Sequence, residues 1–266
     1  MLKKALIFLT TALLSLQAYS DYDMDGVEDS VDRCPNTPFN ELVDIYGCTI
    51  KKAWSEEHFS IIYGIGFSEA DYATNRNVDT FSQTLQVDYY YEEFSLQAST
   101  SYYNSDDDSG MNDSFLGAYY TLSIFERVSL RLGGGVILPT YDTGFNNNNM
   151  DVVASANFSY TAEDINLFGG YSYTVLNDDD IAGVVSYQNT NSYSGGAGFY
   201  PLNALYISSY YTNSESIYKD TENIETLTLY TFYSIDKNWF TTFSYTYGLS
   251  DTAGDNAVEL RLGYYF

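Results

Sequence analysis

The sequence predicts an all-β fold, a transmembrane, antiparallel up-and-down β-barrel of about twelve strands. Apolar residues alternate with small or polar residues over long segments between residues 56 and 266. The 266 residues include 29 tyrosines and only 4 prolines, and aromatic rings are typical of strands that meet a membrane surface. Tight turns and longer polar loops follow one another at intervals of about 35–40 residues, which is the length of two strands and a loop.

Residues 1–20 have the features of a secretory signal peptide. Lys3 and Lys4 precede an apolar segment, and the small residues of Ala18–Ser20 provide a cleavage site. The apolar segment is short for a transmembrane helix. We therefore expect the mature chain to begin at Asp21, outside the cytoplasm. A retained membrane anchor is the alternative.

Residues 21–55 form a short acidic segment with both cysteines of the chain. Its acidic side chains have the spacing of a calcium-binding loop, and Gly26 allows the sharp turn. The expected calcium ligands are Asp21, Asp23, Asp25, the carbonyl of Val27, Asp29 and Asp32. In an oxidising compartment, Cys34 and Cys48 are expected to form one disulfide. A solvated acidic linker held by this disulfide is the alternative.

The same segment resembles one thrombospondin type 3 repeat. The matching residues after the spaced aspartates are Cys34, Pro35, Thr37, Pro38, Val43, Asp44, Gly47 and Cys48. In bacteria, such repeats resemble the linkers beside outer-membrane barrels, and the resemblance implies calcium as the cofactor. The chain departs from the family because it has a single repeat. It also has Asp32 where an EF-hand loop has a longer glutamate.

Residues 56–266 carry the alternating strands. The clearest of them run from Phe59 to Phe67, Phe94 to Tyr102, Val128 to Leu138, Val152 to Tyr160 and Val258 to Phe266. One face is apolar and the other small or polar, the pattern of a barrel with lipid outside and water inside. A soluble sheet has the same period. A β-propeller also repeats near 40 residues, but its blades need four short strands each, whereas each repeat here holds a pair of long ones.

Connections between the strands are of two kinds. Tight turns are expected at Glu92-Glu93, Glu126-Arg127, Glu163-Asp164, Pro201–Ala204 and Asp236–Asn238. Longer loops are expected at Ser68–Asn77, Ser105–Asp113, Pro139–Asn149, Asn177–Tyr187, Ser214–Thr221 and Ser250–Asp255. This alternation predicts about twelve strands with both barrel ends on the periplasmic side. Because Ile181–Tyr187 fits either a strand or a loop, ten and fourteen strands are the alternatives.

The last segment, Ala257–Phe266, resembles the final strand of bacterial outer-membrane β-barrels. Its expected outward residues are Val258, Leu260, Leu262, Tyr264 and Phe266. We expect this strand to close the barrel by pairing with Phe59–Phe67. The resemblance implies a bacterial outer membrane location with lipid and lipopolysaccharide around the barrel. It also implies recognition by the barrel assembly machinery through the strand ending at Phe266, and a periplasmic place for residues 21–55.

Charge narrows the range of partners. The formal net charge of −25 argues against nucleic acid and anionic membrane surfaces and favours cations. Four charged residues fall on the small or polar strand face, toward the lumen: Asp88, Arg131, Glu259 and Arg261. They are expected either to brace the barrel as an internal salt-bridge network or to select solutes by charge.

These features favour a channel for small solutes, with a preference for cations. The alternatives are a non-conducting structural or interaction protein that stabilises the envelope and, more distantly, an outer-membrane hydrolase. We expect no catalytic residues. His58 is the sole histidine, it lies at the start of the first strand, and the sequence contains no Gly-x-Ser-x-Gly motif. Aspartate runs in the loops are expected to be solvated.

Calcium titration of residues 21–50 is predicted to give saturable binding of modest affinity, in the range of extracellular modules. Asp25→Ala removes a ligand oxygen and should weaken this binding. Isothermal titration calorimetry measures both forms, and unchanged binding in the variant would reject the ligand assignment.

Overall fold

The computed structural model describes residues 33, 34, 46, 48, 57–71, 77–106, 108–125, 127–142, 147–162 and 164–266. The chain divides into two compact units, Met1–Trp54 and Ser55–Phe266. In the first unit, Cys34 and Cys48 form the expected disulfide. The Arg33 guanidinium lies 4.0 Å from the centre of the Tyr46 ring. The expected signal peptide and all six expected calcium ligands, Asp21 to Asp32, lie outside the described residues.

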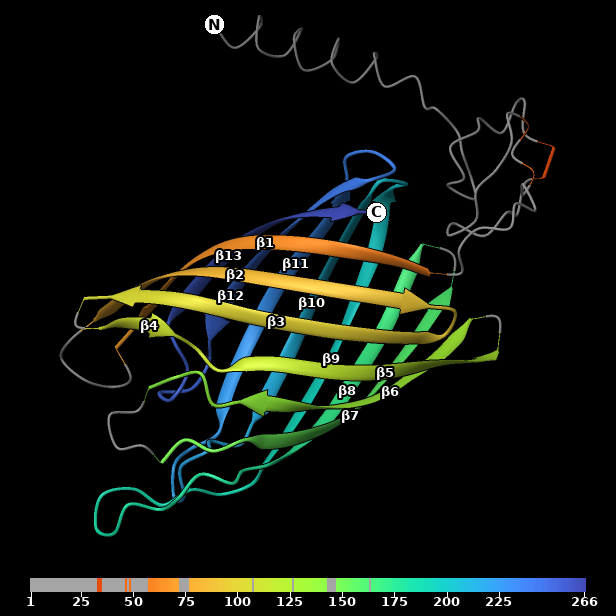
Figure 1. Ribbon diagram of the computed structural model, residues 1–266. Coiled ribbons are helices and arrows are strands. Elements are labelled where there is room, and N and C mark those ends of the chain that lie inside the picture. The colour runs from red at the N-terminus through yellow and green to blue at the C-terminus, as the bar shows by residue number, and fades with distance from the viewer. Residues whose placement is uncertain are drawn as a thin grey trace, which may run out of the picture. The chain divides into compact units, whose positions relative to one another are not determined.

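The second unit is a β-barrel (Figure 1). Its described strands are β1 (Glu57–Ala70), β2 (Val78–Tyr91), β3 (Phe94–Ser105), β4 (Ser109–Met111), β5 (Ser114–Phe125), β6 (Val128–Leu138), β7 (Asp151–Ala162), β8 (Ile165–Val175), β9 (Thr190–Leu202), β10 (Leu205–Ser214), β11 (Ile224–Ser234), β12 (Trp239–Gly248) and β13 (Asn256–Tyr265). Within the described part of the chain, no helix is long and apolar enough to cross a membrane.

All thirteen strands belong to one sheet, in which each long strand pairs with its neighbours in the chain, and β1 also pairs with β13. The sheet therefore closes on itself, and each pairing is antiparallel. The three-residue β4 pairs only with one end of β3, so the other twelve strands form the wall. This confirms the predicted fold class and strand number. Closure leaves none of these twelve described strands at an open edge, as the interior of a bilayer requires.

The closing pair joins the two ends of the barrel sequence. Ser60 lies opposite Tyr265, and the register continues to Glu69 opposite Asn256. Beyond the last strand, the Phe266 N–H donates to the Phe59 carbonyl at 2.9 Å. The rings of Phe59 and Phe266 stack with centroids 4.5 Å apart. The expected pairing of the terminal strand with Phe59–Phe67 is confirmed.

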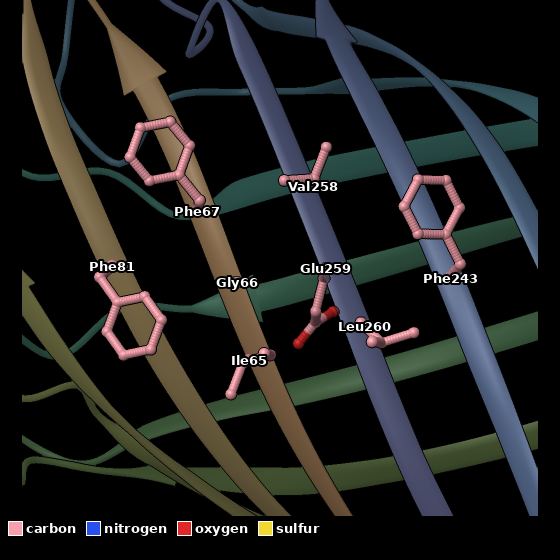
Figure 2. Close-up of a pocket in the computed structure, with 8 residues that line it drawn as sticks. All are labelled: Ile65, Gly66, Phe67, Phe81, Phe243, Val258, Glu259 and Leu260. Carbon is pink, nitrogen blue, oxygen red and sulfur yellow. The ribbon is translucent and has the colours of Figure 1, made fainter.

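The outer surface of the wall is apolar because alternate side chains of every strand point away from the interior. Figure 2 shows one region of it, where six exposed apolar side chains lie on four adjacent strands. These side chains are Phe81 on β2, Ile65 and Phe67 on β1, Val258 and Leu260 on β13, and Phe243 on β12. Exposure of so many large apolar residues is typical of a surface that faces lipid.

The turns that the structure describes in full, among them Glu92-Glu93 and Asp236–Asn238, follow the expectation, whereas one described loop departs from it. In the Asp236–Asn238 turn, the backbone N–H groups of Trp239 and Asn238 each donate to the Asp236 carboxylate at 2.8 Å. They hold its pKa below the ordinary value. Ile181–Tyr187 is a loop with isolated bridges, and the strand after it is β9.

The expected loop Ser105–Asp113 was wrong in part, because Ser109–Met111 forms β4. Its chain folds back on β3, so that Met111 lies opposite Tyr102. Asp108 makes this reversal: its carbonyl accepts from the Ser105 N–H at 2.8 Å, and its carboxylate accepts from the Tyr103 hydroxyl at 2.7 Å. A strand of three residues is too short for alternation to be recognised in the sequence.

Closure predicts a specific cross-link. Ile65 and Leu260 lie directly opposite each other across β1 and β13, so an oxidised Ile65→Cys/Leu260→Cys pair should form a disulfide that circularises the barrel sequence. Gel electrophoresis after unfolding should reveal the altered mobility. Ile65→Cys/Leu262→Cys, which is displaced by two residues along β13, is the control. Equal cross-linking of both pairs would contradict the register.

Candidate functional site in the barrel lumen

A cavity of about 350 Å³ lies against the inner wall of six consecutive strands in the sheet, β2, β1, β13, β12, β11 and β10. Its lining residues alternate along the strands with the outward apolar ones. They are Ser60, Ile62, Gln86, Asp88, Tyr90, Tyr210, Tyr230, Phe232, Phe240, Thr242, Ser244, Glu259, Arg261 and Tyr265. The volume is within the range of small-molecule sites, roughly 300–1,000 Å³.

One side of the cavity carries a chain of polar contacts. The Arg261 guanidinium forms a salt bridge with Glu259 at 2.8 Å and donates to the Gln86 side-chain oxygen at 3.2 Å. The Gln86 amide in turn donates to both carboxylate oxygens of Asp88, at 3.0 and 2.9 Å. Ser60 completes the chain through a longer contact to Asp88, 3.4 Å. The glutamine therefore links the ion pair on β13 with the carboxylate on β2.

The structure brings together three of the four charged residues expected in the lumen. Asp88 is only 6% exposed, and its hydrogen bonds satisfy a buried charge. By contrast, the Arg261 and Glu259 side chains keep 32% and 25% of their surface exposed. Asp88 thus suits a bracing role, whereas the Glu259–Arg261 pair is accessible to a solute.

Arg131, the fourth of these residues, lies elsewhere. Its guanidinium is 3.8 Å from the centre of the Tyr119 ring and donates to Ser95 at 3.2 Å. The Tyr119 hydroxyl donates to Gln97 at 3.2 Å. Among the described residues, Arg131 has a ring and a hydroxyl as partners in place of a carboxylate. A cation–π contact of this kind holds the charge against the wall.

Aromatic side chains form the other part of the cavity. Phe240 lies between Phe232 and Tyr265, with ring centroids 5.4 and 4.6 Å apart, and is only 4% exposed. The Phe240 ring covers Gly263, its cross-strand partner, and occupies the space that a Cβ atom there would need. On the first two strands, the His58 ring stacks on Tyr90 with centroids 4.8 Å apart.

At the end of the barrel opposite the tight turns, asparagine and aspartate runs connect the loops. Asn149 donates its backbone N–H to Asp178 at 2.7 Å and its side-chain amide to Asp179 at 3.2 Å. Asp180 accepts from the Tyr187 backbone N–H at 2.8 Å. That bond and the nearby Lys219 ammonium hold the pKa of Asp180 below its ordinary value. The loops thus form a hydrogen-bonded rim with many carboxylates.

Sequence reasoning identified the charged residues of the cavity but missed Gln86 and the tyrosines. Gln86 shares the inward face of β2 with Asp88, so its position in the alternation is the signal that could have found it. Among the described residues, no group of three or more His, Cys, Asp or Glu side chains is arranged to hold a metal ion. The expected calcium ligands are not in this part of the chain.

Solved structures with a similar fold include outer-membrane channels. The COG4313 outer membrane channel from Pseudomonas putida F1 is 13% identical with a TM-score of 0.60, covering 82% of this chain and 100% of that one. The NanC porin is 13% identical with a TM-score of 0.57, covering 77% and 98%. The KdgM porin in complex with disordered oligogalacturonate is 12% identical with a TM-score of 0.55, covering 78% and 98%.

No family model matches the sequence, and no curated protein matches it either. At these identities, the structural comparisons show the fold alone. The chain thus has the fold of an outer-membrane porin-type β-barrel.

Gly263→Ala is predicted to destabilise the barrel. The added Cβ would occupy the position of the Phe240 ring, and Phe232 and Tyr265 prevent that ring from moving aside. Overpacking of this kind costs about 1–3 kcal/mol, measurable by urea unfolding in detergent. Gly195→Ala is the control, because the nearest atom to its added Cβ is 3.9 Å away. Equal stability of the two variants would contradict the packing described.

Proposed function

We propose that the chain is a porin-like channel for small solutes in the bacterial outer membrane. The observation that carries this proposal is the polar cavity inside a closed barrel whose outer surface is apolar. An interior with a partly exposed ion pair, Glu259–Arg261, needs water around it. A water-filled interior in a lipid-embedded wall provides a path for polar solutes.

The similar structures support this proposal. Those with a TM-score above 0.5 are called an outer membrane channel or a porin, and one of them was solved with oligogalacturonate. Their sequences are too different to carry over a solute. The class of activity, passage of small solutes, is the part that the shared fold favours.

We propose further that the channel favours cations. The chain has 36 acidic residues against 11 lysines and arginines. Many of the carboxylates lie in the loop rim, including those of Asp178, Asp179 and Asp180. Such a rim raises the local concentration of cations. Inside the cavity the charges are closer to balance, so the rim contributes most of this preference.

Residues 21–55 are proposed to bind calcium on the periplasmic side, on the strength of their aspartate spacing and resemblance to a thrombospondin type 3 repeat. Lipid and lipopolysaccharide are the proposed surroundings of the barrel. The barrel assembly machinery is the proposed partner of the strand that ends at Phe266. These proposals are independent of conduction, since a non-conducting envelope protein would share them.

Planar-bilayer recording of the purified protein tests the channel. We predict discrete conductance steps with a reversal potential, in a KCl gradient, that favours potassium. Arg261→Gln removes the cation that lines the cavity and leaves Glu259, so the potassium-to-chloride permeability ratio should rise. Two unit charges 4 Å apart in water interact by about 1 kcal/mol, which corresponds to about a fivefold change in this permeability ratio.

Lys237→Gln is the matched control, because its ammonium lies in the exposed Asp236–Asn238 turn, outside the cavity and at the end of the barrel opposite the acidic rim. It should change the ratio little. Absence of conductance steps above background would reject the channel and favour the structural alternative. Equal ratios in the two variants would remove Arg261 from the solute path.

A further inference from the structure

We infer that the lumen cavity is a binding site for a neutral saccharide, an inference that rests on the proposed channel function and names its solute class. A neutral saccharide is a ring with apolar C–H faces and several hydroxyl groups. The cavity offers a matching combination of unused hydroxyls, paired charges and aromatic side chains.

Three tyrosine hydroxyls in the cavity are available to a solute. Those of Tyr210, Tyr230 and Tyr265 make no hydrogen bond to any residue in the described part of the chain, although all three side chains line the cavity. Other inward tyrosines do have partners: the Tyr206 hydroxyl donates to Asn166 at 3.0 Å. A phenol hydroxyl both donates and accepts, which matches the hydroxyl groups of a sugar.

The charges in the cavity favour a neutral solute over a charged one. Glu259 and Arg261 neutralise each other at 2.8 Å, and the remaining carboxylate, Asp88, is buried away from a solute and hydrogen-bonded by Gln86. An anionic solute drawn to Arg261 would be repelled by Glu259, and a cationic solute drawn to Glu259 would be repelled by Arg261. A sugar hydroxyl group, by contrast, accepts from the guanidinium while a neighbouring one donates to the carboxylate.

The aromatic side chains favour a ring over an open polyol. Phe232 on β11 and Tyr265 on β13 pack against Phe240 on β12, and Tyr230 on β11 also lines the cavity. Together they give the cavity an apolar side on which C–H faces pack. A purely apolar solute fits less well. It would strip water from the ion pair and from the hydroxyls of Thr242 and Ser244 without replacing those hydrogen bonds.

Ligand-observed NMR titration of the detergent-solubilised full-length protein tests the site. The probes are maltose as a neutral sugar, glucuronate as an anion, glucosamine as a cation and phenol as a small aromatic. Maltose should bind saturably and more tightly than the other three. Tyr230→Phe/Tyr265→Phe keeps both rings and removes both hydroxyls, so the dissociation constant for maltose should rise at least about fivefold.

Tyr245→Phe is the matched control. Its hydroxyl donates to Asn256 at 2.6 Å on the exposed outer surface, and it should bind maltose like the unmodified chain. Absence of saturable maltose binding, equal binding by the double variant, or tighter binding of any other probe would overturn the inference.

Conductance separates this inference from the proposed channel. Conductance steps without maltose binding would retain the channel and reject the saccharide site. Maltose binding lost in the double variant but without conductance would support the site and reject the channel.

Discussion

The hydrogen-bonded seam between β1 and β13 is the constraint on which the rest of the barrel depends. In a bilayer, an unpaired strand edge would expose a row of backbone N–H and C=O groups to hydrocarbon, at a cost of several kcal/mol for each group. The seam pairs these groups from Ser60 to Glu69. It also fixes which side chains face inward, because a shift of one residue would turn every side chain of a strand to the opposite surface.

That register builds the cavity. Gly64 of β1 lies opposite Arg261 on β13 and Thr84 on β2. A residue without a side chain therefore separates β13 from β2 at this level of the wall. The Arg261 side chain crosses over this glycine, where an added Cβ would come within 2.9 Å of it, and reaches Gln86 on β2. A contact between residues 175 positions apart in the chain therefore depends on closure. Without the seam, the ion pair on β13 would not reach Gln86 and, through it, the buried Asp88 on β2.

Much of the fold follows from local patterns. Alternation located the long strands, and turn residues such as those of Asp236–Asn238 located the tight connections, because both signals lie within a few neighbouring residues. The strand β4 did not follow, since its pairing with β3 depends on contacts made by Asp108 rather than on a periodic pattern.

The site was less accessible to sequence reasoning. Alternation placed Asp88, Glu259 and Arg261 on one face, but which of them meet depends on strand register and closure. Arg131 shows the difficulty, because its ring partner Tyr119 lies on a neighbouring strand and no local signal distinguishes that contact from a salt bridge. The three available tyrosine hydroxyls were likewise not recognisable in the sequence. Alternation places them on the same inward face as tyrosines such as Tyr206, whose hydroxyl has a partner.

A lipid-embedded barrel with a water-filled lumen requires that one face of each strand meets water while the other meets lipid. Adjacent residues of β12 test it most directly: Ser244 lines the cavity, whereas Phe243 is on the outer surface. With single cysteines at these two positions in protein reconstituted into lipid vesicles, a charged, membrane-impermeant thiol reagent should label Ser244→Cys rapidly and Phe243→Cys hardly at all. Equal labelling, or faster labelling of Phe243→Cys, would contradict a water-filled lumen in this barrel.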